Sequence, residues 1–283
     1  MDNVPFSMLG NSFFKIYLLG KEEKTMVECG VSGVIPVILK ELIKADVRRI
    51  LVMHAHFDHV CGLPLLKEIY PQAVVAASEK AASVLARNSV VERFFREDRA
   101  MTDTLSGPAR DFIRPDKINI DEIVCDGDRL HIGKGQSLHI MSAPGHSPCS
   151  ILAYFPEEET VFCSDSAGFP VDSKTSFPIY FDGFTDYIET IKKIMELSVN
   201  FLAGAHDEVV RGQKLVRDYL ENSLDWAEKT REYVTRGLKE GIESETLAKK
   251  LFDQFYRDRL KIYTQDNILL CCRLIVKRSE EAI

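Results

Sequence analysis

The sequence predicts an α/β fold followed by a helical C-terminal region. Two patterns carry this prediction. Short apolar runs rich in β-branched residues recur up to about residue 210, and helical or turn-forming segments separate them. After Glu208 the chain is more charged, and its apolar residues follow a helical spacing. We therefore expect an α/β body over residues 1–210 and a helical extension over residues 211–283 that packs on it as a lid or a dimer surface.

The elements of the body follow from its periodicity. Residues 34–47 space their apolar side chains like an amphipathic helix, and RRILVM (48–53) is typical of a buried strand. Asp58 and His59 are expected to open the next helix, where an aspartate suits the positive end of the helix dipole. Further strands are expected at residues 13–19, 25–30, 73–78, 122–133, 137–146, 149–156, 160–165 and 200–206, with further helices at 79–105, 184–197 and 211–256.

Two connections are expected as well. The prolines and glycine of residues 106–120 predict a loop, and Gly237 and Gly241 are expected to divide the helical extension.

Composition limits the class of protein. The chain has 43 acidic and 36 basic residues, a formal net charge of −7, and no dense Lys/Arg stripe, so no nucleic-acid partner is expected. No stretch approaches the roughly 20 apolar residues that span a bilayer, so no membrane partner is expected. The N-terminus lacks the basic start of a secretory signal, and the seven cysteines are an odd number. A cytoplasmic location is expected.

Histidine and aspartate side chains follow several of the predicted strands. Three of the seven histidines lie in HAHFDH, with an aspartate between them. The ends of neighbouring strands meet at one edge of a sheet, so the donors should converge. Imidazole and carboxylate groups suit zinc or iron, and manganese as a third choice, and carboxylates can bridge two metals. The sequence therefore predicts two divalent metal ions bound by His54, His56, Asp58, His59, His146, Asp165 and His206.

These motifs resemble those of the metallo-β-lactamase superfamily. The resemblance covers roughly residues 10–210 and rests on HAHFDH, APGHS, CSDSAG, AGAH and the turn DGDRLHIG. It implies an αββα sandwich of two facing sheets with helices outside. It also implies that His54, His56 and His146 hold one metal, that Asp58, His59 and His206 hold the other, and that Asp165 bridges them.

Departures from the family pattern narrow the predicted chemistry. The β-lactamase branch commonly has a cysteine at the second metal, whereas Asp165 stands at the aligned position here, which disfavours lactamase activity. Oxygen-reducing di-iron relatives usually carry a glutamate where this chain has His56, which favours hydrolysis. Residues 73–95 and 178–194 and the helical tail resemble the branch of the quinolone-signal response thioesterase, a di-iron member whose terminal helices cover the active site.

The resulting hypothesis is a dinuclear metallo-hydrolase. A metal-bridging hydroxide, oriented by Asp58, would attack the carbonyl of a small-molecule ester or of an acyl-CoA-like thioester. Phe169 and Tyr180 are candidates for the wall of the substrate pocket. The alternatives are a lactonase, a glutathione-thioester hydrolase, and a metal-binding regulatory protein with little turnover. The amphipathic pattern of the helical tail is also compatible with a homodimer.

Overall fold

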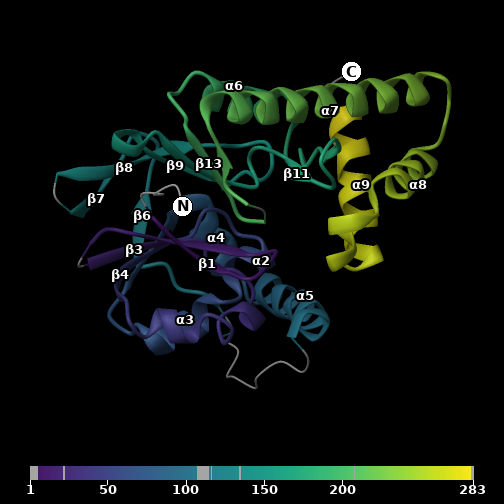
Figure 1. The fold of residues 1–283 in the computed structure, drawn as a ribbon. Helices are drawn as coiled ribbons and strands as arrows, with labels where there is room; N and C mark the ends of the chain where they lie inside the picture. Colours follow the sequence, from purple (N-terminus) through teal and green to yellow (C-terminus); the bar gives the residue numbers. More distant parts are fainter. Residues whose placement is uncertain are drawn as a thin grey trace. The chain divides into compact units, whose positions relative to one another are not determined.

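The computed structural model describes residues 6–21, 23–106, 115, 117–133, 135–206 and 208–281. The chain divides into two compact units, which Figure 1 draws as one ribbon. Unit 1 comprises residues 1–142, 149–164 and 202–209, and unit 2 comprises residues 143–148, 165–201 and 210–283. Most of the predicted connection at residues 106–120 lies outside the described residues.

The first sheet of unit 1 is mixed. Its strand order is β1-β2-β3-β4-β5-β6, antiparallel from β1 to β3 and parallel from β3 to β6. Because β3, β4 and β5 run parallel, their carboxyl ends share one edge of the sheet. The strands are β1 (Ser7–Gly10), β2 (Lys15–Leu19), β3 (Glu23–Val27), β4 (Asp46–Leu51), β5 (Val74–Ser78) and β6 (Glu122–Val124).

The second sheet of unit 1 contains strands in the order β13-β10-β9-β8-β7, with antiparallel pairing from β10 to β7. Aromatic side chains fill the space between the two sheets. Tyr17 of β2 packs against Phe162 of β10 with ring centroids 5.1 Å apart, and its hydroxyl donates to Gly204 O of β13 at 2.5 Å. The strands are β7 (Arg129–Gly133), β8 (Gln136–Ser142), β9 (Ile151–Phe155), β10 (Thr160–Ser164) and β13 (Phe201–Gly204).

The helices of unit 1 correct one prediction. Residues 34–47 do not form one amphipathic helix: the structure has the short turns η1 (Ser32–Val34) and α1 (Leu39–Leu42), followed by the start of β4. Pro36 cannot donate a helical hydrogen bond, and Ser32 is held by Asp98 through its backbone N–H and its hydroxyl. The remaining helices are α2 (Phe57–Val60), α3 (Leu63–Ile69), α4 (Glu79–Leu85) and α5 (Asn88–Ser106).

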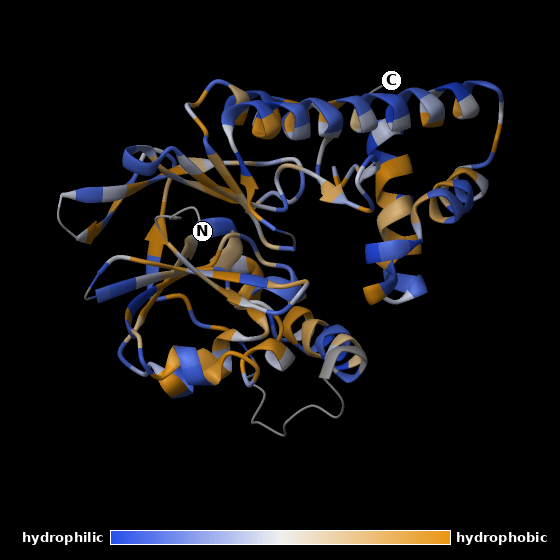
Figure 2. Ribbon diagram, in the orientation of Figure 1, coloured by the Kyte–Doolittle hydropathy of each residue, from blue (hydrophilic) through white to orange (hydrophobic). Residues whose placement is uncertain are grey.

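Unit 2 is mainly helical. The prediction that Gly237 divides the tail is wrong, because Gly237 is buried inside α7, where an added Cβ would lie 2.7 Å from Leu247. Gly241, at φ +82°, does end that helix. In Figure 2, α7 is largely hydrophilic, whereas the strands are largely hydrophobic. The elements are β11 (Phe169–Pro170), β12 (Ser176–Phe177), α6 (Phe184–Met195), β14 (Val210–Arg211), α7 (Gln213–Lys239), α8 (Ser244–Phe255), η3 (Asp258–Ile262) and α9 (Gln265–Glu280).

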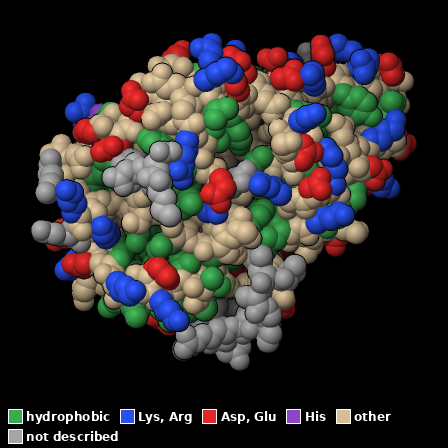
Figure 3. All heavy atoms as spheres, in the orientation of Figure 1, with side chains coloured by type: hydrophobic (Ala, Val, Ile, Leu, Met, Phe, Trp, Pro, Cys, Tyr) green, Lys and Arg blue, Asp and Glu red, His purple; other side chains and the backbone are tan. Residues whose placement is uncertain are grey.

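The predicted fold class is confirmed: the protein is an α/β sandwich of two sheets with C-terminal helices α7–α9. Among the described helices, none has the length and apolar character that a membrane span needs. Acidic and basic side chains are interspersed on the face shown in Figure 3.

Candidate metal centre

Three of the predicted donors form a tight group in unit 1. Asp58, His59 and His206 are all buried. The Nε2 atoms of His59 and His206 lie 3.2 Å apart, and Asp58 Oδ2 lies 3.7 Å and 3.4 Å from them respectively. A tetrahedral zinc with bonds of about 2.0–2.2 Å separates its ligand atoms by about 3.3–3.6 Å. The three donors therefore fit one metal ion without a change of backbone.

The group is assembled from the ends of two strands. Asp58 and His59 follow β4 and form the first turn of α2, and His206 follows β13. The backbone N–H of Lys15 donates to Ala205 O at 2.8 Å, which fixes the segment before His206. The rings of Phe13 and Phe14 pack on the His206 imidazole with centroids 4.9 and 5.4 Å away. These contacts hold the imidazole in a dry environment, where metal binding is strengthened.

His54 and His56 form a second pair of donors in unit 1. His54 Nε2 lies 3.0 Å from His56 Nδ1, and His54 Nδ1 lies 3.3 Å from Ser164 Oγ. Hydrogen bonding between the two rings would account for the 3.0 Å contact alone. The contact also suits two ligands of one metal. In that case His54 Nδ1 donates its proton to the hydroxyl of Ser164, and Nε2 is the atom that would bind the metal.

Unit 2 holds the last two donors. His146 Nε2 lies 3.4 Å from Asp165 Oδ2, and His146 Nδ1 lies 3.0 Å from Ile179 O. Because a carbonyl oxygen only accepts, Nδ1 carries the proton and donates to it. Nε2 is thereby left as a lone-pair donor that faces the carboxylate. Both side chains are buried, and both follow a strand as the sequence predicted.

The structure adds Glu28, which the sequence prediction missed. Glu28 directly follows β3, is 2% exposed, and takes a left-handed backbone conformation at φ +73°. Its Oε2 lies 2.9 Å from His59 Nδ1. His59 therefore donates from Nδ1 to the carboxylate, and its Nε2, which faces His206 and Asp58, can offer its lone pair to a metal. Buried carboxylates of this kind fix the ring and raise its basicity as a ligand.

Glu28→Gln is expected to weaken metal binding at the group of Asp58, His59 and His206. A neutral amide still fits the space, but it accepts a weaker hydrogen bond from His59, so the expected loss of metal affinity is about 10- to 100-fold. Titration with a competing chelator measures this affinity.

The matched control is Glu68→Gln, which removes a charge from α3 at a position away from the donor group. It should leave the metal affinity unchanged. Equal affinity in the Glu28 variant and the control would show that Glu28 is only a packing residue.

Phe169 and Tyr180, the predicted substrate contacts, both lie in unit 2. Phe169 is 4% exposed, and its ring is 6.1 Å from that of Tyr263. Tyr180 is fully buried, and its hydroxyl lies 2.9 Å from Ser279 Oγ of α9. Burial raises the pKa of Tyr180, so the phenol is neutral. The substrate role of both residues stays a prediction.

The fold and the donors together define the class of the protein: an α/β sandwich with two groups of histidine and aspartate donors, as dinuclear metallo-hydrolases have. Residues 15–206 match the family model described as the metallo-beta-lactamase superfamily. The chain belongs to that superfamily.

The chain is also similar to a curated protein. Glyoxylase B2 of Dictyostelium discoideum is 31% identical over 149 residues, which are 52% of this chain and 45% of that protein. The chain thus matches less than half the length of that relative.

Two solved structures share the fold. The metallo-beta-lactamase family protein TTHA1429 from Thermus thermophilus has a TM-score of 0.62 at 19% identity, over 98% of this chain and 94% of that one. The archaeal superfamily protein ST1585 from Sulfolobus tokodaii has a TM-score of 0.57 at 20% identity, over 77% and 86%.

Proposed function

We propose that the protein is a dinuclear metal-dependent hydrolase that cleaves a small-molecule thioester or ester. The observation that carries the proposal is the buried triangle of Asp58, His59 and His206, with ligand separations that suit a metal ion. We further propose that His146 and Asp165 complete the site of His54 and His56. This arrangement would use all seven predicted donors, as the superfamily motif implies.

The chemistry follows from the donor set. Two bound metal ions would lower the pKa of a water molecule to near neutrality and polarise a carbonyl group. Asp58 contributes a carboxylate, one oxygen of which faces the two imidazoles of its group. Its other oxygen can accept a hydrogen bond from the attacking water and orient it. Glu28 and Ile179 O keep the imidazoles of His59 and His146 in their ligating tautomers.

One observation favours a thioester as substrate, and a second disfavours a β-lactam. Similarity to the protein named glyoxylase B2 points to thioester hydrolysis. Asp165 stands where the β-lactamase branch commonly has a cysteine, which disfavours β-lactam cleavage. We also propose a place near the quinolone-signal response thioesterase branch, supported by the helices α7–α9 that follow the family-matched region.

Hydrolysis of a glutathione thioester is the second candidate, and the same glyoxylase similarity favours it. Such enzymes offer basic residues from their helical tail to the peptide carboxylates. In this tail, the Arg257 guanidinium pairs with Asp172 Oδ2 at 2.9 Å and bonds Thr175 Oγ1 at 2.9 Å. These contacts leave other N–H donors of the guanidinium for a ligand, so they do not decide between the two substrates, and acyl-CoA-like thioesters stay first in the proposal. Lactone hydrolysis is the other alternative within this chemistry.

A substrate panel tests the proposal. Purified protein with its metal content measured is assayed against acyl-CoA and glutathione thioesters, an aryl ester, a lactone and a β-lactam. The expected result is turnover of at least one thioester, well above that of free metal at the same concentration, and little turnover of the β-lactam. Metal-loaded protein with no turnover of any ester, thioester or lactone would favour the metal-binding regulatory alternative.

The proposal includes three further expectations from the sequence. They are a division of the chain near residue 210, a cytoplasmic location, and a homodimer formed through the helical tail. Size-exclusion chromatography with light scattering measures the oligomeric state. A monomer at working concentration would remove the dimer from the proposal.

A further inference from the structure

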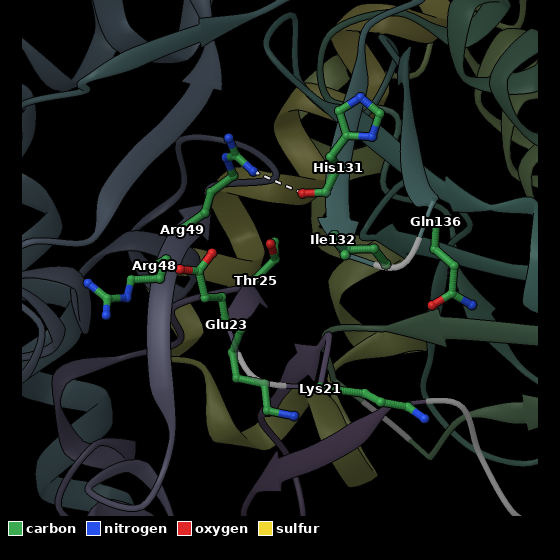
Figure 4. A pocket seen from close by; sticks show the side chains of 10 residues that line it. Lys21, Glu23, Thr25, Arg48, Arg49, His131, Ile132 and Gln136 are labelled. Atoms are coloured by element: carbon green, nitrogen blue, oxygen red, sulfur yellow. Dashed lines mark hydrogen bonds between the residues drawn. The ribbon is translucent and has the colours of Figure 1, made fainter.

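Unit 1 contains a cavity of about 480 Å³ that none of the metal donors lines. Small-molecule sites are typically about 300–1,000 Å³, so the space is sufficient for a metabolite. Figure 4 shows its walls: the β2–β3 turn and β4 from the first sheet, and β7 with the start of β8 from the second. The polar side chains along these walls include Lys21, Lys24, Arg48, Arg49, His131 and Gln136.

Two β-bulges shape this cavity. In the β3–β4 pairing, Lys24 opposes Val47 and Thr25 opposes Arg49, so Arg48 is an extra residue. Successive side chains of a regular strand point to opposite faces, but a bulge re-aims them, and here both arginines line the cavity. The β7–β8 pairing shifts at the same place, between His131 and Gly133. One irregularity from each sheet therefore meets at the cavity.

Gly20 brings the two walls together. It has φ +91°, and a Cβ at this position would lie 2.4 Å from Glu23 O and 3.1 Å from Ile132 O. The turn between β2 and β3 can therefore approach β7 only because residue 20 has no side chain. The same contact leaves the side chains of Lys21 and Lys24 at the rim of the cavity.

The charge of the lining favours an anion. Among the described residues that line it, four are cations, Lys21, Lys24, Arg48 and Arg49, and one is an acid, Glu23. Nearby carboxylates offset part of this charge. Arg48 Nε lies 2.8 Å from Asp46 Oδ1, and Arg49 Nε lies 3.3 Å from Glu122 Oε2.

Each guanidinium has five N–H donors, so one ion pair leaves others for a ligand. Lys24 Nζ donates only to a neutral carbonyl, Gly20 O, among the contacts described for it. The cavity therefore offers several cationic donors to a ligand that enters it.

The cavity is remote from the metal donors. Arg49 lies within β4, and His54 follows the end of that strand, five residues on. At about 3.3 Å per residue, the Cα atoms of Arg49 and His54 lie at most about 16 Å apart, because the chain leaves the strand after Leu51. A small ligand in the cavity would not touch the imidazoles.

We propose that this cavity binds a phosphorylated small molecule of up to nucleotide size. Phosphate groups carry several acceptor oxygens and match the fork of an arginine and the ammonium of a lysine. The site is additional to the proposed hydrolytic centre and does not depend on it.

Calorimetric titration of the metal-loaded protein with pyrophosphate, ADP and citrate, without added magnesium, tests the proposal. The cavity variant is Lys21→Gln with Arg48→Gln, two cations on exposed residues. The control is Lys40→Gln with Lys44→Gln, which removes the same charge near α1, outside the cavity lining. We expect saturable binding of pyrophosphate or ADP that weakens at least about tenfold in the cavity variant and less than about twofold in the control.

Several outcomes would overturn the proposal. Wild-type protein that binds neither phosphate probe excludes the site. Equal weakening in both variants shows non-specific attraction, and no weakening in either places the anion at the metal ions. Citrate that binds more tightly than both phosphates excludes the phosphate class. Thioester turnover should be unchanged in the cavity variant, which separates this result from any failure of the proposed hydrolase.

Discussion

Asp58→Ala is expected to remove one of two bound metal ions and to lower hydrolytic turnover more than about a hundredfold. The carboxylate lies 3.4 Å and 3.7 Å from the imidazoles of His206 and His59, so its loss takes away one of the three donors of this group. Loss of supporting residues alone costs about 10- to 100-fold, and a ligand should cost more. Elemental analysis of the purified variant, together with a thioester assay, measures both effects.

A simpler role for Asp58 would be to stabilise the first turn of α2, in which it lies. The residue at the N-cap of α2 is His56, and no side-chain capping bond is made there. If Asp58 nonetheless acted only on the helix, Asp58→Asn would restore full function, because asparagine serves a helix N-terminus about as well as aspartate. We expect the Asn variant to fold and still to lose the metal. Asp103→Ala, an exposed position on α5, is the control for handling and expression. Two metals per chain in Asp58→Ala would contradict the proposed centre.

Looking for donors at strand ends located the candidate ligands in the sequence: His54, His56 and Asp58 follow β4, and His206 follows β13. These strands belong to different sheets, so the 3.4 Å contact between Asp58 and His206 depends on how the two sheets of unit 1 face each other, which the rule for one sheet does not cover. Glu28 follows β3, which runs parallel to β4, so the same rule could have found it. It was missed because a single acid in TMVECG has no local pattern. Its partner, His59, is 31 residues away.

Other features could not be predicted from periodicity. The apolar spacing of residues 34–47 suits a helix, but Pro36 and the tie between Ser32 and Asp98 override it. Gly237 is typical of a helix breaker in the sequence, yet it is the position at which α7 gives room to Leu247. The basic cavity depends on two bulges, and a bulge is set by pairing between strands rather than by either strand alone.

Gly145→Ala is expected to destabilise the protein by about 3 kcal/mol or more and to displace His146. Gly145 has φ +117°, where a side chain costs about 1–2 kcal/mol. An added Cβ would also lie 2.3 Å from the backbone N and Cα of Tyr187 in α6, a clash that adds about 1–3 kcal/mol. The carbonyl of Gly145 accepts from the N–H groups of Asp182 and Gly183 at 2.9 and 3.2 Å, so the glycine ties the histidine loop to the start of that helix.

The contribution of the close contact can be separated from that of the backbone. Gly127 also has a positive φ, +89°, but an added Cβ there meets nothing within 4 Å. Gly127→Ala should therefore lose only the conformational part, about 1–2 kcal/mol, in urea unfolding followed by circular dichroism. If both variants lose the same free energy of unfolding, the approach of Gly145 to α6 does not limit stability. His146 immediately follows the glycine, and its ring is held by the bond to Ile179 O. A larger loss of stability for Gly145→Ala, together with reduced metal content, would therefore show that the contact with α6 positions His146 as a ligand.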